Sequence, residues 1–260
     1  MTPNPCIECN RHLKFTQLHQ KARELQCDVV VTGHYARITK DEQGYHLLKG
    51  KDAAKDQSYV LYSLTQEQLA HTCFPLGEYT KEEIRRMAEE QGFFNAGKKD
   101  SQDICFIPDG DYRRFIEETT GQKSTPGNFV DQEGNVLGIH KGYYCYTIGQ
   151  RRGLGISAPQ SLYVVEIRPE KNEVVLGSNE DLFHSHLTAD HFNWIEQVGP
   201  DEIIKARIRY HQTEKEATVR VLEDNRVEVD FLEPQRAITK GQAVVPYRGD
   251  AVAGGGRIIG

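Results

Sequence analysis

The sequence predicts an α/β domain followed by a part built from β-strands, so the expected fold class is α/β plus β. A helical pattern, a run of β-branched residues and a glycine turn follow one another near the start of the chain. From about residue 126 the sequence changes to short alternating strands and compact turns, a pattern typical of a small β-barrel. With 260 residues and 38% hydrophobic content, two or three domains are expected rather than one large core.

The first elements are a predicted helix and a predicted buried strand. We expect the helix to run from an N-cap at Asn10 to about Gln26. Residues 28–32 are mostly β-branched and predict a strand inside a parallel sheet. Gly33 and His34 follow this strand, in the place where open α/β sheets bind ligands, although His34 could equally be an ordinary loop histidine. The apolar stripe of the helix would consist of Leu13, Leu18, Ala22 and Leu25.

The later elements have clearer boundaries. Residues 45–50 predict a short strand, and Thr80 with Glu83 forms a capping box that opens a helix ending before Gly92. A further short helix is expected from about Tyr112 to Glu118. The remaining predicted strands are 143–148, 162–167, 173–176, 203–210, 216–222, 226–232 and 243–247.

Composition excludes several function classes. No apolar run approaches the roughly 20 residues needed to span a bilayer, and the start of the chain has no secretory signal pattern, so a cytoplasmic protein is expected. The net charge of −6 argues against indiscriminate binding to nucleic acid. Any contact with RNA would need a local basic surface, for which Lys205, Arg207 and Arg209 alternate on one face of a predicted strand.

Six cysteines in a reducing compartment indicate thiol chemistry or metal binding rather than a disulfide framework. The Cys6-x-x-Cys9 pair has three interpretations: half a zinc site, a redox pair, or a nucleophile with a helper. No second such pair follows, which disfavours zinc. Cys105 lies between acidic residues and an apolar stop, so folding could bring three sulfur atoms together. The other cysteines lie in apolar surroundings and are expected to be packed in the interior: Cys27, Cys73 and Cys145.

Seven sequence strings in order resemble the tRNA-specific 2-thiouridylases of the MnmA type. They are TPNPCIECNRHLKF, TGHYAR, KDQSYVL, KKDSQDICFI, YTIGQRRGLGI, RIRYHQ and PQRAITKGQAVV, and they span nearly the whole chain. The resemblance implies part of a doubly wound domain like that of ATP pyrophosphatases (adenine nucleotide alpha hydrolase-like) at residues 1–106. It further implies a central domain at 107–165 and a C-terminal β-barrel that contacts tRNA at 166–260.

The activity implied by the resemblance is replacement of the C2 oxygen of the wobble uridine of tRNA, position 34, by sulfur. Because that oxygen leaves poorly, ATP with Mg²⁺ first adenylates it, and a sulfur nucleophile then displaces AMP. In the resemblance, Cys105 receives sulfur from a donor protein and carries it as a persulfide, while Cys9 is the nucleophile that attacks or resolves it. The two thiols would finish as a transient redox disulfide. Lys98 and Lys99 are nearby cations that could lower a cysteine pKa.

The resemblance also implies the remaining site residues. Gly33 would contact the nucleotide. The target base would be lined by Asn4, Pro5 and Cys6. The residues expected to meet tRNA are His34, Lys55, Asp56, Gln57, Arg209, Tyr210 and Gln242.

Two departures from the family pattern matter. Some members carry an aspartate where this chain has Cys6, so Cys6, Cys9 and Cys105 could instead hold three corners of an iron–sulfur cluster. The glycine-rich pyrophosphate loop Ser-Gly-Gly-x-Asp-Ser is not in the sequence, whose one glycine run lies at residues 254–256. The sequence therefore reads as truncated, and ATP-dependent activity of these 260 residues alone is doubtful. Two other classes stay open: a tRNA-binding module without catalysis, and a thiol–disulfide oxidoreductase.

Overall fold

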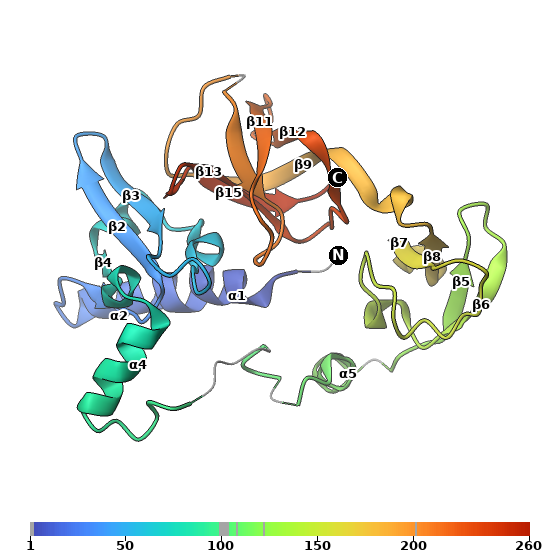
Figure 1. The fold of residues 1–260 in the computed structure, drawn as a ribbon, viewed down its shortest axis with the longest axis horizontal. Coiled ribbons are helices and arrows are strands. Elements are labelled where there is room, and N and C mark those ends of the chain that lie inside the picture. Colours follow the sequence, from blue (N-terminus) through green and yellow to red (C-terminus); the bar gives the residue numbers. More distant parts are fainter. Residues whose placement is uncertain (1–2, 99–103, 108, 122, 201) are drawn as a thin grey trace.

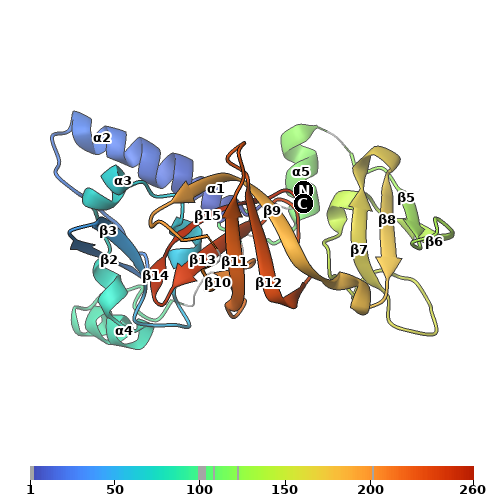
Figure 2. The same cartoon turned by 90° about the horizontal axis from the view of Figure 1, so that it is seen from above.

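The computed structural model describes residues 3–98, 104–107, 109–121, 123–200 and 202–260. A β-barrel lies between an α/β part on one side and a small sheet on the other (Figures 1 and 2). The α/β part contains α1 (Pro5–Glu8), the π-helix η1 (Cys9–Gln17), α2 (Leu18–Glu24), β1 (Val30–Val31), β2 (Ala36–Asp41), β3 (Gly44–Lys49), η2 (Ser58–Leu61), α3 (Gln66–Ala70), β4 (Thr72–Cys73), η3 (Pro75–Glu78) and α4 (Lys81–Glu90).

The first helix begins earlier than predicted. Asn4 rather than Asn10 is the N-cap, because its side chain accepts a hydrogen bond from the backbone of Cys6 at 3.1 Å and Pro5 fills the first helical position. Asn10 is instead buried and donates from Nδ2 to the carbonyl of Val60 at 3.2 Å. The expected strand at 28–32 is shorter, since only Val30 and Val31 pair, in parallel, with β4.

The predicted apolar stripe of the first helix does not face the core. Leu13, Leu18 and Leu25 are exposed, whereas Phe15 and His19 are buried. The prediction assumed 3.6 residues per turn, but residues 9–17 form a π-helix, whose wider i→i+5 turn rotates each later side chain relative to that pattern. The change of period is therefore the physical reason for the error.

The two later helices confirm their predictions. Thr80 and Glu83 form the capping box that opens α4, and Gly92, just past its end, has φ +72°. The other helix, α5 (Tyr112–Thr120), ends at Gly121, which adopts the left-handed conformation.

The central part is a four-stranded sheet in the order β6-β5-β8-β7. Its strands are β5 (Gly127–Val130), β6 (Val136–His140), β7 (Tyr163–Arg168) and β8 (Glu173–Gly177). The predicted strand at 143–148 is wrong, because Tyr143–Cys145 form a 3₁₀ turn that packs on this sheet. The domain limits remain a proposal, and the pairing of β7 with β8 favours placing the second limit after Gly177 rather than after residue 165.

The predicted barrel is confirmed. Six strands close on themselves in the order β10-β11-β12-β9-β15-β13, with β10 pairing back to β13. The strands of this part are β9 (Phe183–Trp194), β10 (Ile204–Arg207), β11 (Lys215–Val221), β12 (Val227–Arg236), β13 (Ala243–Arg248), β14 (Ala251–Val252) and β15 (Gly254–Ile258). Short 3₁₀ turns also occur at η5 (Pro169–Lys171) and η6 (Glu180–Leu182).

The α/β part and the barrel share one hydrophobic core. The hairpin β2–β3 extends the barrel sheet through β14, where Ala251 pairs with Leu48. Phe15 and Tyr59 belong to the same buried cluster as Val245 and Tyr247. The Tyr59 hydroxyl donates to the carbonyl of Ala243 at 2.9 Å. This shared core fixes the first helices against the barrel, and with them every side chain that lies between the two.

In the described ranges, no helix combines the length and the apolar character needed to cross a membrane.

A substitution at Gly77 would test the close approach of η3 to β2. A Cβ added at Gly77 would lie 1.8 Å from the backbone oxygen of Ala36, so Gly77→Ala forces backbone to move. We expect it to lower the free energy of unfolding by about 1–3 kcal/mol or more, measured by urea denaturation. Gly97→Ala is the matched control, because nothing lies within 4 Å of its added Cβ. Equal stability of the two variants would contradict the packing described.

The contacts of His46 predict that the free energy of unfolding depends on pH. Its Nδ1 lies 2.7 Å from Glu196 and its Nε2 lies 2.9 Å from Asp41, and Glu196 also pairs with Arg248. The contacts with Asp41 and then Glu196 raise the pKa of His46. The stabilisation is therefore complete below the unfolded pKa of about 6.5 and is lost as the pH rises through the higher folded pKa. Denaturation of His46→Gln and the parent protein should differ most in mildly acid buffer; a difference that grows toward alkaline pH would contradict this assignment.

Candidate sulfur-transfer site and nucleic-acid interface

The N-terminal motif places two cysteines on consecutive helical turns. Asn4 caps α1, so its side-chain oxygen is already engaged, and Pro5 fixes the first helical residue. Cys6 is exposed on α1, and Cys9 is half-buried at the first residue of η1. The cap therefore sets the orientation of both thiols.

Cys105 is the third cysteine to consider, because it acts electrostatically on Cys6. It lies in the described segment 104–107, where the buried side chain of Ile107 anchors the chain. Although Cys6 is exposed, burial of part of its surface raises the pKa of its thiol. The nearby Cys105 and Cys9 add to that increase, and Lys14 opposes it. Cys105, Cys9 and Lys14 therefore all act on the thiol of Cys6.

All six cysteines lie in the described part of the chain and are free thiols. Two predictions of interior packing were wrong, because Cys27 and Cys73 are exposed; Cys145 is half-buried against the core of the central sheet. Among the described residues, no three His, Cys, Asp or Glu side chains are arranged to hold a metal ion. The described residues therefore do not show an iron–sulfur site at Cys6, Cys9 and Cys105, and the cluster stays a prediction.

His34 is buried rather than presented to solvent. Its Nδ1 lies 2.8 Å from the Thr32 hydroxyl and its Nε2 lies 3.3 Å from the ammonium of Lys14. The rings of Phe15 and Phe74 pack on it at 5.7 and 5.6 Å. Burial, and then the charge of Lys14, lower the pKa of His34 to about 4, so the ring is neutral at pH 7. A tRNA contact by His34 stays a prediction, and this burial disfavours it.

Gly33 precedes His34 and is exposed, in the turn that follows β1. This is the position after a parallel strand where the sequence placed a nucleotide contact. A Cβ at Gly33 would meet Leu76 at 3.4 Å, so the backbone approaches η3 closely. The nucleotide contact itself stays a prediction.

The loop that contains Lys55, Asp56 and Gln57 is anchored by its middle residue. Asp56 is 5% exposed, and it accepts hydrogen bonds from the backbone of Gly50 and from the backbone and hydroxyl of Ser58. Gln57 accepts a hydrogen bond from the backbone of Tyr35 at 3.0 Å. Lys55 is half-buried. Asp56 therefore holds the loop in shape, which leaves its neighbours as better candidates for contact with a ligand.

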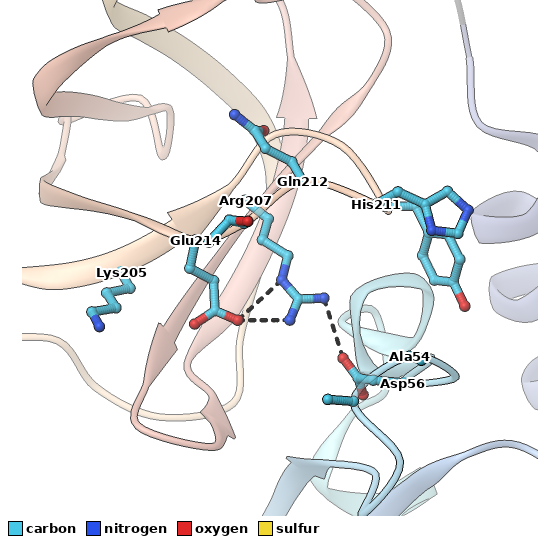
Figure 3. A pocket seen from close by; sticks show the side chains of 10 residues that line it. Ala54, Asp56, Lys205, Arg207, His211, Gln212 and Glu214 are labelled. Carbon is cyan, nitrogen blue, oxygen red and sulfur yellow. Dashed lines mark hydrogen bonds and ion pairs between the residues drawn. The ribbon is translucent and has the colours of Figure 1, made fainter. Parts of the chain in front are cut away.

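Arg207 joins this loop to the barrel (Figure 3). Its guanidinium donates to Asp56 at 3.2 Å and to Glu214 at 2.7 Å, and it lies over the ring of Tyr247 at 5.0 Å. Glu214 also pairs with Lys49 at 2.7 Å. The expected basic stripe is therefore not a row of free cations, because Asp56 and Glu214 neutralise the charge of Arg207. In Figure 3, Glu214 lies between Arg207 and Lys205.

Three adjoining cavities form what we call the interdomain groove. One of about 430 Å³ is lined by Asp56, Arg207 and Tyr210 among others, and a second of about 430 Å³ by Arg209, Tyr210 and Gln242. The third, of about 580 Å³, is lined by Asn4 of the N-terminal motif and again by Gln242. The groove thus brings together residues that are more than 230 positions apart in the sequence.

Arg209 and Tyr210 lie just after β10, not within it as predicted. The Nη2 atom of Arg209 donates to the carbonyls of Ile148 and Ala237 and to the Thr239 hydroxyl. Burial raises the pKa of Tyr210 to about 12, and the charges of Asp56 and then Cys6 contribute. Asn4, which bonds to the backbone of Cys6, lines the third cavity, so the groove lies beside Cys6.

Several residues of the site were not singled out from the sequence. Lys14 stands inside the first motif string, but a lysine near a helix centre is normally a solvated residue, so nothing marked it. Glu214 and His211 gave no signal, since their role depends on strands that meet only in the folded barrel. Of the two lysines proposed to lower a cysteine pKa, Lys99 is outside the described residues, whereas the cation that acts on Cys6 is Lys14.

Comparisons with known proteins define the class first: an α/β domain of the HUP type joined to two β-domains. Residues 1–109 match the family of the tRNA methyl transferase HUP domain, residues 113–178 that of the tRNA methyl transferase PRC-barrel domain, and residues 184–258 that of the aminomethyltransferase beta-barrel domain.

The chain is 51% identical to a tRNA-specific 2-thiouridylase MnmA of Lachnoclostridium phytofermentans, over 99% of this chain and 73% of that protein. It is 51% identical to the enzyme of the same name from Carboxydothermus hydrogenoformans, over 99% and 72%. It is 52% identical to tRNA-specific 2-thiouridylase MnmA 1 of Caldanaerobacter subterraneus subsp. tengcongensis, over the same shares. The chain belongs to the MnmA family of tRNA-specific 2-thiouridylases, which confirms the resemblance found in its motifs.

The Arg207 contacts predict a large loss of stability when the arginine is removed. Arg207→Gln leaves the buried charge of Asp56 without a cation, while Glu214 keeps its pair with Lys49, so the free energy of unfolding should fall by about 3–5 kcal/mol. Lys215→Gln is the control, because it breaks only an exposed pair with Glu233 and should cost about 0–1 kcal/mol. Urea denaturation measures both, and similar losses for the two variants would contradict the structural role of Arg207.

Proposed function

We propose that this protein takes part in 2-thiolation of the wobble uridine of tRNA, as a sulfurtransferase that carries sulfur on Cys105. The observation that carries the proposal is the placement of two free thiols, Cys6 and Cys9, on the helices that follow the Asn4 cap, while Asn4 itself lines the interdomain groove. A uridine entering that groove would meet sulfur on one side and the barrel on the other. Membership in the family supports the same reaction.

The groove suits an unstacked nucleotide. Its walls offer the Tyr210 ring, the Arg209 guanidinium and the Gln242 amide, which are the groups that proteins use to stack on and hydrogen-bond to single-stranded RNA bases. Each cavity has the volume needed for one nucleotide-sized group. We assign Asn4, Pro5 and Cys6 to the target-base end because Asn4 lines the cavity that shares Gln242.

The sulfur chemistry follows from two thiols with different roles. A donor protein transfers one sulfur atom to Cys105, which then carries a terminal persulfide anion. That sulfur attacks C2 of the uridine after its oxygen has been adenylated by ATP, and AMP departs with the oxygen. The thiolate of Cys9 next attacks Sγ of Cys105, so that 2-thiouridine is released and a Cys9–Cys105 disulfide forms. An external dithiol restores both thiols by supplying two electrons.

ATP is a substrate in this proposal, and Gly33 is the one residue that we assign to it. The 260-residue sequence contains no Ser-Gly-Gly-x-Asp-Ser string, so no phosphate contact is assigned within it. Mg²⁺ and a cytoplasmic location stay predictions.

Sulfur loading tests the proposal directly. After incubation with inorganic polysulfide as sulfur donor and removal of excess, peptide mass spectrometry should find one added sulfur on Cys105. Cys9→Ser should keep that adduct because the resolving thiol is gone, whereas Cys105→Ser should abolish it. Cys27→Ser is the control, since Cys27 is also an exposed free thiol but lies outside both cysteine motifs.

Sulfur loading, together with assays of tRNA binding and of disulfide reduction, separates the alternatives. A non-catalytic tRNA-binding module would load sulfur no better on Cys105 than on Cys27 and would bind tRNA equally well after both serine substitutions. A general thiol–disulfide oxidoreductase would reduce a small disulfide substrate at a rate insensitive to Arg209→Gln. Either result would contradict the proposed function.

A further inference from the structure

No step of the proposed reaction uses the motif string YTIGQRRGLGI, which occupies residues 146–156. Near its start is a loop at residues 147–150, called the 147–150 loop below, and Thr147 lines the same cavity of the interdomain groove as Arg209. We propose that Arg209 and Arg236 clamp the 147–150 loop onto the barrel, and that this clamp positions Thr147 as the wall of the groove that meets an RNA base. The clamp itself is independent of the proposed function, whereas the RNA base rests on it.

Hydrogen bonds make the 147–150 loop a rigid extension of the central sheet. The backbone N–H of Gly149 donates to the carbonyl of Val164 on β7 at 2.8 Å, and the N–H of Val164 donates to the carbonyl of Gln150 at 3.0 Å. The side chain of Gln150 accepts a hydrogen bond from the backbone of Thr147 at 3.1 Å. Any group that holds this loop therefore also holds the central sheet.

Arg209 reaches the loop from the barrel. Its Nη2 atom donates to the carbonyl of Ile148 at 3.3 Å, and to the carbonyl of Ala237 and the hydroxyl of Thr239 at 3.0 Å each. Ala237 is buried and has a φ of +59°, a left-handed conformation that alanine rarely adopts. The N–H of Ala237 donates to the carbonyl of Leu182 at 2.7 Å, which helps to hold this strained backbone. Such strain persists where a structure needs a fixed direction, here that of the carbonyl that Arg209 binds.

Arg236, the last residue of β12, holds the loop at the next carbonyl. Its Nη2 atom donates to the carbonyl of Gly149 at 3.4 Å, and its Nε atom donates to Oδ1 of Asn179 at 3.1 Å. The guanidinium also lies over the ring of Tyr163, the first residue of β7, at 5.4 Å from its centroid. Gly149 has a φ of +86°, and a Cβ added there would lie 3.2 Å from Nη1 of Arg236. The glycine therefore permits the close approach.

The clamp determines where Thr147 lies in the groove. Thr147 immediately precedes the two residues whose carbonyls the arginines bind, so it is fixed within one or two peptide units of the barrel. Several donors of Arg209 and Arg236 are already engaged with protein oxygen atoms, which suits them to hold a loop rather than to neutralise an RNA phosphate. A released loop would let Thr147 move away from the cavity of about 430 Å³ that it lines, and a base bound there would lose this contact.

Hydrogen–deuterium exchange with mass spectrometry tests the clamp without RNA. Arg236→Gln should raise the exchange rate of peptides that contain Gly149 and Val164 by about tenfold or more, because the loop loses contacts with a charged group and opens more often. Arg236→Lys should raise it as well, since lysine keeps the charge but lacks the planar fork. Arg226→Gln is the control, because Arg226 is a barrel arginine that pairs with a neighbour on its own turn. Unchanged exchange in Arg236→Gln, or an equal increase in Arg226→Gln, would overturn the clamp.

Fluorescence anisotropy with RNA tests the wall. The parent protein should bind an anticodon stem–loop RNA with uridine at position 34 about fivefold or more tightly than the same RNA with that base removed, as contact with one base requires. Arg236→Gln and Arg236→Lys should both reduce this preference to within about twofold, with little change in affinity for the abasic RNA. Arg226→Gln should keep the preference of the parent.

The remaining outcomes separate the clamp from other roles. Equal weakening of both RNAs in Arg236→Gln, restored in Arg236→Lys, would identify a phosphate contact and overturn the inference. Faster exchange of the loop with an unchanged preference for uridine would also overturn it, because the clamp would then not shape the groove. If exchange responds as expected while the parent shows no preference for uridine, the clamp stands and the proposed RNA function of the groove fails.

Discussion

The position of the groove depends on the ion pairs of Arg207. This side chain comes from β10 of the barrel and donates to Asp56, which in turn holds the backbone of the loop at Gly50 and Ser58. Burying three charges is costly unless each is paired and hydrogen-bonded, and here each is. The contacts therefore fix one relative placement of loop and barrel better than apolar packing alone, which tolerates sliding. Tyr210, three positions after the strand, is placed by the same contacts.

The π-helix is the second constraint, because it determines which side chains of the first helical segment are buried. A π-helix has poorer hydrogen-bond geometry than an α-helix and persists where the surrounding structure compensates it. Here the compensation comes from the buried Asn10, which bonds to Val60, and from Gln68, which bonds to Phe15. Both partners are in the α/β part, in elements that pack against the barrel core. The unusual turn is thus supported by the same core that positions the groove.

The fold was largely predictable because its signals are local. The capping box of Thr80 and Glu83, the glycine after α5 and the alternating strands of the barrel each follow from a few neighbouring residues. The failures have two causes. The start of the first helix was marked locally, because Asn4 caps it and Pro5 fills its first position, but Asn10 offered a second possible cap. The buried face depended on a change of helical period that no local pattern marks. The turn at residues 143–145 reads as a strand because its tyrosines are β-favouring, yet they pack on a sheet rather than join it.

Burial divides the predicted site residues into two groups. The motif strings selected Asp56 and His34 as residues that meet RNA, and both are buried with their polar atoms engaged. A motif identifies residues that a site needs, but it does not distinguish a residue that touches the ligand from one that holds such a residue in place. That distinction requires burial and hydrogen-bond partners, which only the fold supplies.

The acidic character of the chain is consistent with an RNA site of this kind. Non-specific RNA binding depends on many unpaired cations along the backbone, and a chain of net charge −6 does not offer them in bulk. In the groove Arg207 is neutralised and Arg209 donates to three protein oxygens, so the rings of Tyr210 and His211 are the groups best suited to meet a base. Such groups bind an unstacked base by stacking and edge contacts, which discriminate a flipped nucleotide from a duplex. The groove therefore favours recognition of one exposed base over attraction to RNA in general, as a reaction at a single uridine requires.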